Sequence, residues 1–328
     1  VKHKAASIAE IVKQHMSRTS HLLFLTFIWF ALIYVIIAFT DITAHTFKTV
    51  SAEMAYGPGV AASSILYLLL GMIMGIMLYR FKFKLWLATV IFLPLVFLIV
   101  WVGPRLPQPI ISLLADIPLK QWDVFLLVYC FIASVIPMWL LLQPRGYLGG
   151  WLLYLTILVG LIGAIFGGLR IEYPAFNTEG LRSLVNDKLI FPILFITVAC
   201  GACSGFHGIV SSGTTSKQLY RESDALPVGY GAMLLEGLVA VLALATVMMI
   251  PKGSAILKTD PNLIYANGIA SYLGLVGVGF SIAFPFALLA FSTFVYDTLD
   301  VCTRLARYIL QELLGWHTRI GGYIAALI

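Results

Sequence analysis

A stretch of small and polar residues follows an apolar run near the middle of the sequence. The apolar run begins near Leu189, and the chain then reads ACGACSGFHGIVSSGTTSKQL up to Leu219. Helix-breaking polar sequence at membrane depth is tolerated where it lines a cavity inside the protein. The N–H groups freed by a broken helix can bind an anion, and its free carbonyl groups can bind a cation. The candidate substrate-binding residues are Gly205, His207, Ser211, Ser212, Gly213 and Thr214.

The same stretch has two simpler interpretations. Gly201 and Gly205 form a small-x-x-x-small pattern, which is typical of two membrane helices that pack closely. The hydroxyl residues that follow could also cap a helix or form a loop at the cytoplasmic surface. Close packing alone does not explain a histidine and several hydroxyl residues next to the glycines.

Glu236 is a second candidate, because it lies near the middle of an apolar span. An acidic side chain there costs free energy and commonly marks a proton or ion pathway. Helical spacing places Glu236 on one stripe with Gly229, Ala232 and Ala240, so it faces another helix or a cavity. Burial favours the neutral form of a carboxylic acid, which makes Glu236 a candidate proton carrier. The alternative is an acid that only forms a hydrogen bond to a neighbouring helix.

A third cluster ends the last full span, where hydroxyl residues precede two acids. Ser292, Thr293 and Asp297 are candidates for coupling to an ion, and Asp300 follows them. Hydroxyl and carboxylate oxygens are ligands that bind hard cations. In the other interpretation, these are residues at a helix end that meet water, with Asp300 paired to Arg304.

The sequence contains none of the enzyme motifs that we looked for. The six histidines do not form an H-E-x-x-H zinc helix, and no nucleophile elbow is present. No glycine-rich turn is followed by a P-loop lysine. We therefore expect a protein that is not an enzyme and that needs no cofactor or metal. Protons are the expected coupling ion, and sodium is left open.

The composition identifies the environment in which these residues must work. Of the 328 residues, 60% are hydrophobic and 11% are charged, and the mean hydropathy is +0.96. A soluble domain has about a quarter charged residues, so this chain is an integral membrane protein whose partner is the lipid bilayer. The net charge of +6 lies in short loops between spans, which argues against a nucleic-acid partner.

The sequence predicts an all-α, polytopic bundle of about eight transmembrane helices. Residues 1–20 form an amphipathic cytoplasmic segment, 21–297 the transmembrane domain, 298–320 a cytoplasmic interfacial helix, and 321–328 the start of a further span. The predicted spans are 21–41, 58–79, 85–102, 124–142, 147–168, an interrupted 189–206, 228–250 and 276–297.

Basic residues predict the orientation in the membrane. Thirteen of the 21 lysines and arginines fall in one set of alternate loops and eight in the other set. The positive-inside rule places the first set, which includes Arg80 and Arg145, in the cytoplasm. We therefore expect a multi-pass protein of the cell inner (cytoplasmic) membrane. The chain opens on Val1 and closes inside an apolar run, so we also expect it to be a truncated part of a longer protein.

Several motifs resemble the carbon starvation protein A (CstA) family. The run from Ala199 to Leu219 is similar to the family signature. Three further pieces are similar to the family: LLLQPRGYL from Leu140, GYGAMLLE up to Glu236, and DVCTRLARYILQELLG from Asp300. The resemblance covers most of the chain. It implies a secondary transporter of the APC type with a LeuT-like fold and a broken helix, related to uptake of peptides and pyruvate in starvation.

The residues and the resemblance together predict a secondary active transporter. Its substrate is expected to be a small carboxylate-bearing nutrient, namely a short peptide, an amino acid or pyruvate, imported by symport with an ion. The broken helix and His207 would bind the substrate, and Glu236 would carry the proton. The alternative is a membrane sensor or subunit that binds the nutrient, does not transport it, and signals to a partner. The sequence does not indicate the exact substrate or the oligomeric state.

Overall fold

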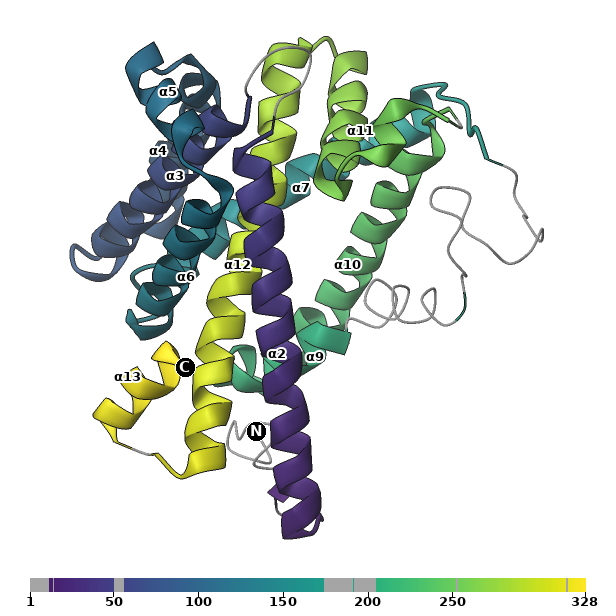
Figure 1. Cartoon of the computed structure of the whole chain (residues 1–328). Helices are drawn as coiled ribbons and strands as arrows, with labels where there is room; N and C mark the ends of the chain where they lie inside the picture. Colours follow the sequence, from purple (N-terminus) through teal and green to yellow (C-terminus); the bar gives the residue numbers. More distant parts are fainter. Residues whose placement is uncertain are drawn as a thin grey trace. The chain divides into compact units, whose positions relative to one another are not determined.

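The computed structural model describes residues 12–13, 15–49, 56–173, 191, 205–251, 253–316 and 318–328. Every regular element within these residues is helical, and no strand occurs among them (Figure 1). Six of these helices are long and apolar enough to cross a membrane. The predicted all-α, polytopic class is therefore confirmed.

The chain divides into two compact units, and the first consists of Arg18–Thr156 and Ser281–Ile328. In this unit α3 packs against α2, α4 and α5, and α6 packs against α2 and α13. Helices α2 and α12 are antiparallel. At one end His21 Nε2 lies 3.4 Å from Glu312 Oε1, and toward the other end the rings of Phe47 and Tyr296 are 6.3 Å apart. The helices are α2 (Arg18–Phe47), α3 (Tyr56–Tyr79), α4 (Leu85–Val102), η1 (Gly103–Arg105), α5 (Gln108–Asp116), α6 (Leu119–Val135), the first part of α7 (Leu142–Phe166), α12 (Phe280–Leu314) and α13 (Arg319–Leu327).

The second unit contains Ile157–Phe280. Its helices α10 and α11 pack against each other. Gly268 permits this contact, since a Cβ atom there would lie 2.2 Å from Thr246 Cβ. The turn after α11 contains Gly277, whose φ of 87° is a left-handed conformation that favours glycine. The elements are the end of α7, α9 (Gly205–Gly213), η2 (Thr215–Lys217), η3 (Glu222–Asp224), α10 (Ala225–Met248), η4 (Ala255–Lys258) and α11 (Pro261–Leu275).

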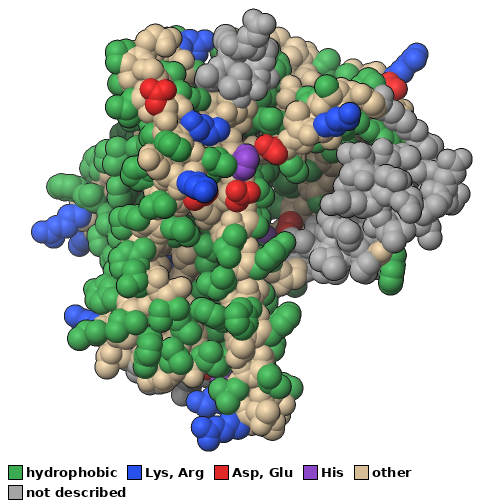
Figure 2. All heavy atoms as spheres, in the orientation of Figure 1, with side chains coloured by type: hydrophobic (Ala, Val, Ile, Leu, Met, Phe, Trp, Pro, Cys, Tyr) green, Lys and Arg blue, Asp and Glu red, His purple; other side chains and the backbone are tan. Residues whose placement is uncertain are grey.

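The surface of these helices is largely apolar, as Figure 2 shows for one face. Phe27 on α2 is 69% exposed and Leu226 on α10 is 73% exposed. Exposed large apolar side chains along helices of this length are typical of segments that face lipid or other apolar helices. Helix α12 differs, because most of its side chains between Ala283 and Leu310 are buried.

The predicted span 124–142 is wrong in its boundaries. Helix α6 covers Leu119–Val135, and α7 begins at Leu142. The helix ends here because Pro137 has no N–H group and disfavours helical geometry in the residue before it. Ile136 accordingly adopts an extended conformation, with a ψ of 142°.

The predicted division at residue 298, between the transmembrane domain and the interfacial helix, lies within one continuous helix. Helix α12 continues without interruption from Phe280 to Leu314, because no proline or glycine occurs between Phe286 and Leu314. Asp300 and Arg304, which were expected on a solvent-exposed face, are only 1% and 4% exposed. The charged part of α12 is therefore an interior element of its unit.

Other predictions fall partly outside the described residues. Most of the interrupted span 189–206 and most of the amphipathic segment 1–20 lie outside them. The short helices α5 and α11 were not predicted. Residues 321–328 lie mainly in α13, a nine-residue helix capped by Thr318, whose Oγ1 accepts a hydrogen bond from Gly321 N.

Candidate functional site

A fully buried arginine lies at the centre of the first unit. Arg145 occupies the first turn of α7, and its side chain has no exposed surface. A guanidinium group carries its charge at any physiological pH, so it must be compensated inside the protein. The sequence interpretation placed Arg145 in a cytoplasmic loop, and the structure corrects this.

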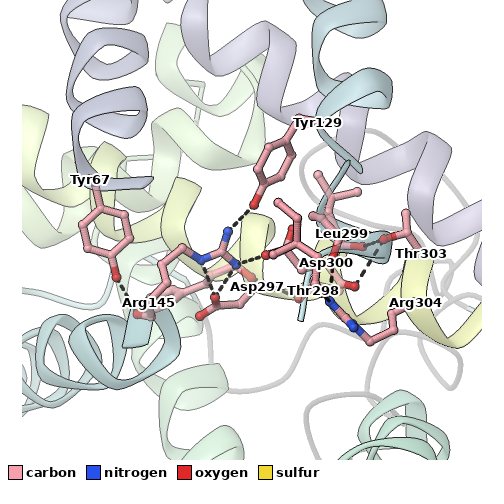
Figure 3. A network of polar contacts seen from close by, with 12 residues as sticks. Tyr67, Tyr129, Arg145, Asp297, Thr298, Leu299, Asp300, Thr303 and Arg304 are labelled. Carbon is pink, nitrogen blue, oxygen red and sulfur yellow. Dashed lines mark hydrogen bonds and ion pairs between the residues drawn. The ribbon is translucent and has the colours of Figure 1, made fainter. Parts of the chain in front are cut away.

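Two carboxylates on α12 and a tyrosine on α6 surround the Arg145 guanidinium (Figure 3). Its Nε atom donates a hydrogen bond to Asp297 Oδ1 at 3.0 Å, and Nη2 lies 2.7 Å from Asp300 Oδ2. The Nη1 atom donates to the Tyr129 hydroxyl. Tyr67 on α3 donates from its hydroxyl to the backbone carbonyl of Arg145 at 2.7 Å. We call these five residues the Arg145 network.

The two carboxylates of this network have different surroundings. The Asp297 side chain is 31% exposed, whereas that of Asp300 is 2% exposed. Asp300 also forms a side-chain hydrogen bond with Tyr129. One guanidinium therefore serves two acids, and the Tyr129 hydroxyl adds a hydrogen bond to the more deeply buried acid.

Small residues allow the helices to approach each other around Arg145. A Cβ atom on Gly71 of α3 would lie 3.3 Å from Arg145 Cβ. A Cβ atom on Gly149 would lie 3.2 Å from Thr293 Cγ2, 3.3 Å from Asp297 Oδ2 and 3.4 Å from the Tyr67 hydroxyl. The network thus depends on the side chains that pair and on the glycines that bring their backbones close.

Arg304 lies one turn beyond Asp300 and has a different role. Its Nη2 atom donates to the carbonyl oxygens of Ala133 at 2.6 Å and Ile136 at 2.7 Å. These carbonyls lie at the C-terminal end of α6, where the chain supplies no helical N–H partner. A cation at this end also interacts favourably with the helix dipole. The predicted pairing of Asp300 with Arg304 is replaced by this capping contact.

His207 and Glu236, which were predicted for separate roles, lie together in the second unit. The distance between His207 Nδ1 on α9 and Glu236 Oε2 on α10 is 2.9 Å. The side chains are 54% and 23% exposed, so both atoms are close to the surface of the unit. A histidine and a carboxylate at this distance can share or exchange a proton. We call them the His207–Glu236 pair.

The other predicted substrate-binding residues lie in or just after α9. Ser211 Oγ donates to Gly208 O at 3.1 Å, and Thr214 Oγ1 donates to Val210 O at 2.9 Å. These hydroxyls use their protons within the helix but keep lone pairs that can accept a hydrogen bond. A Cβ atom on Gly205 would meet no atom within 4 Å. The Ser212 side chain and the surroundings of Gly213 lie outside the described set.

Of the predicted ion-coupling residues on α12, Thr293 lies on the same helix face as Asp297 and Asp300 of the Arg145 network, whereas Ser292 points about 100° away from Thr293. Thr293 Oγ1 donates to Leu289 O at 2.8 Å. Ser292 Oγ is buried without a hydrogen-bond partner among the described residues. Within the described residues, no group of three or more His, Cys, Asp or Glu side chains is arranged to hold a metal ion.

Sequence reasoning missed Arg145, Tyr129 and Tyr67 as members of this site. Helical spacing does indicate the α12 side of this site. Asp297, Asp300 and Arg304 follow the i, i+3, i+7 pattern of residues on one helix face. That pattern indicates one polar face on an otherwise apolar helix. It does not indicate which residue from another helix meets this face.

Comparison with known proteins identifies a family of transporters. The family model described as "Carbon starvation protein CstA" matches residues 1–264. The peptide transporter CstA of Escherichia coli is 33% identical over 246 residues, which are 57% of this chain and 34% of that protein. The peptide transporter CstA of Bacillus subtilis is 31% identical over 252 residues, which are 66% of this chain and 42% of that protein.

A relative that is named for another transport activity is also similar. The pyruvate/proton symporter BtsT of Escherichia coli is 44% identical over 128 residues, which are 38% of this chain and 18% of that protein. The chain spans 34% to 42% of the length of the two CstA proteins. No solved structure matches the chain significantly.

Proposed function

Because the chain belongs to the carbon starvation protein CstA family, we propose that it is a secondary active transporter of the inner membrane. The proposed substrate is a small carboxylate-bearing nutrient: a short peptide, an amino acid or pyruvate. The proposed driving force is a proton gradient. The activities for which the relatives are named, peptide transport and pyruvate/proton symport, support this choice.

One observation carries the proposal, and it is the 2.9 Å distance within the His207–Glu236 pair. A histidine N–H group that can bind a carboxylate of the protein is chemically suited to bind a carboxylate of a substrate. The two anions compete for the same N–H group. Glu236 therefore controls whether His207 is available to the substrate.

Protonation of Glu236 provides the coupling step. The neutral acid attracts the imidazolium more weakly than the carboxylate does, so His207 becomes free to bind the substrate carboxylate. When Glu236 releases its proton on the other side of the membrane, its carboxylate again competes for His207 and favours substrate release. Proton and substrate then bind together and leave together, as symport requires.

A proton fits the His207–Glu236 pair better than sodium does, because the imidazole contributes nitrogen and sodium prefers oxygen ligands. The oxygens of Ser292, Thr293 and Asp297 would be the alternative ligands for sodium. These residues belong to the other unit and stay a prediction for ion coupling. Experiments with separate proton and sodium gradients distinguish the two ions.

The proposed activity is tested by uptake of labelled pyruvate and dipeptides into proteoliposomes. We expect uptake to respond to an inward proton gradient and to fall at least tenfold in His207→Ala, since loss of one charge-assisted hydrogen bond to a substrate has about that effect. In Glu236→Gln we expect substrate binding to persist without response to the proton gradient. The proposed roles of His207 and Glu236 are contradicted if both variants keep uptake that responds to the proton gradient.

A matched control comes from a second histidine–carboxylate pair. His45 Nε2 lies 3.7 Å from Asp41 Oδ1 within α2, and both side chains are well exposed at 44% and 61%. His45→Ala and Asp41→Asn remove the same chemical groups outside the candidate site. These two variants are expected to transport at the level of the unsubstituted protein.

A further inference from the structure

A cavity of about 270 Å³ lies in the first unit, near the ends of α12 and α6 and beside α13. Figure 1 shows α13 beside the C-terminal part of α12. The residues that line the cavity include Arg307 and Gln311 from α12. Thr318, Arg319 and Tyr323, at or in α13, also line it. It is separate from the Arg145 network and from the His207–Glu236 pair, because none of those residues lines it.

The cavity is built for a negative charge. It contains two arginines, and no carboxylate occurs among the described residues that line it. The nearest acid along α12 is Glu312, which pairs with His21 at 3.4 Å. Two guanidinium groups that share a cavity without an acid repel each other, so an anion between them is favourable.

Contacts with Tyr308 hold the Arg307 guanidinium beside the cavity. The Arg307 side chain forms a hydrogen bond with the Tyr308 side chain. The Cζ atom of Arg307 lies 4.8 Å from the centre of the Tyr308 ring, so this contact fixes one face of the guanidinium plane. A guanidinium group has five N–H donors, so Arg307 keeps donors that can bind the oxygens of a ligand.

The helix beside the cavity adds a second favourable contribution. Thr318 is the N-cap residue of α13 and Arg319 is its first residue. The cavity therefore adjoins the positive end of a helix dipole, where N–H groups have no intrahelical partner. Gln311, Thr318 and Tyr323 offer neutral polar groups around the same space. Their hydroxyl and amide groups can donate to anion oxygens.

We propose that this cavity binds a phosphate group. A phosphate has several acceptor oxygens, which match two guanidinium groups, a hydroxyl and a helix N-terminus better than one carboxylate does. The volume of about 270 Å³ lies just below the range of pockets for drug-sized ligands, which starts at about 300 Å³, so a phosphate headgroup can be accommodated. Because these residues are predicted to lie on the cytoplasmic side, the phosphate can come from an anionic lipid headgroup or from a soluble phosphate.

Thermal unfolding of the purified protein in detergent tests this proposal. In one arm, inorganic phosphate replaces chloride in steps, so that the ionic strength stays constant. The other arm compares micelles that contain phosphatidylglycerol with micelles that contain only phosphatidylcholine. A rise in the unfolding temperature in the first arm identifies soluble phosphate as a ligand, and a rise in the second arm alone identifies a lipid headgroup.

Substitutions localise the effect to the cavity. Arg319 is exposed, so Arg319→Gln is expected to fold and to weaken the response to the active probe about tenfold. Arg307→Gln combined with Arg319→Gln should abolish the response, whereas Arg319→Lys should retain part of it because the charge remains. Arg105→Gln, at an exposed arginine outside the cavity, is the control and should respond fully.

Two results would overturn the proposal. One is that neither probe raises the unfolding temperature of the unsubstituted protein. The other is that Arg319→Gln responds as strongly as the Arg105→Gln control. Because neither measurement depends on transport, failure of this proposal is independent of failure of the proposed function.

Discussion

Replacement of Arg145 by glutamine is the perturbation with the largest expected effect on stability. The side chain of Arg145 is fully buried and contacts Asp297, Asp300 and the Tyr129 hydroxyl. Its loss removes the cation that contacts the Asp300 carboxylate, whose side chain is 2% exposed. Removing one partner of a buried ion pair typically lowers the free energy of unfolding by about 3–5 kcal/mol. We therefore expect Arg145→Gln to be destabilised by that amount.

The free energy of unfolding is measured in mixed micelles that contain an increasing fraction of a denaturing detergent. The fluorescence of the seven tryptophans provides the signal. Arg105→Gln is the control, since Arg105 is exposed and contacts mainly the Trp101 ring at 4.9 Å. A surface substitution of this kind is expected to change the free energy of unfolding by about 0.5 kcal/mol or less.

A second substitution tests the reason for the loss. If the destabilisation comes from an uncompensated acid, adding Asp300→Asn to Arg145→Gln should recover part of it, about 1–3 kcal/mol. The reasoning is refuted if Arg145→Gln unfolds like Arg105→Gln. It is also refuted if Arg145→Gln and Asp300→Asn are simply additive, because residues of one network should be coupled.

Two further predictions concern helix packing and capping in the same unit. Gly149→Ala should be about 1–2 kcal/mol less stable than Gly150→Ala, because a Cβ atom at 149 lies 3.2 Å from Thr293 Cγ2 whereas one at 150 meets nothing within 4 Å. Equal unfolding midpoints of these two variants would exclude the close contact. Arg304→Gln should lower the free energy of unfolding by about 2 kcal/mol, because it removes hydrogen bonds of 2.6 and 2.7 Å to carbonyls at the end of α6. A loss no larger than that of Arg105→Gln would show that these carbonyls do not need the guanidinium.

The sequence predicted the class of the fold because its information lies in local composition. Long apolar runs with few charges require helices in a membrane, and six such helices are present in the described residues. Helix ends were predicted less well. Helix α6 ends at Val135, earlier than hydropathy suggested, because of Pro137. Hydropathy did not indicate this end, because Ile136, Pro137 and Met138 are as compatible with a span as the residues before them.

The Arg145 network could not be predicted, because it depends on contacts between distant parts of the chain. Arg145 and Asp297 are 152 residues apart, and in the sequence Arg145 resembles an ordinary charge between two spans. The residues of the His207–Glu236 pair were predicted individually, because a histidine among glycines and an acid in an apolar helix are each unusual. Their proximity depends on how the chain places α9 beside Glu236, which neither residue alone indicates.

The most direct test of proton coupling is the entry of protons driven by substrate alone. Proteoliposomes with a pH-sensitive dye inside are prepared without an ion gradient, and pyruvate or a dipeptide is added outside. We predict that the interior becomes acidic with the unsubstituted protein and with the control Glu222→Gln, but not with Glu236→Gln. Substrate entry without acidification, or equal acidification with Glu236→Gln, would contradict proton coupling through the His207–Glu236 pair.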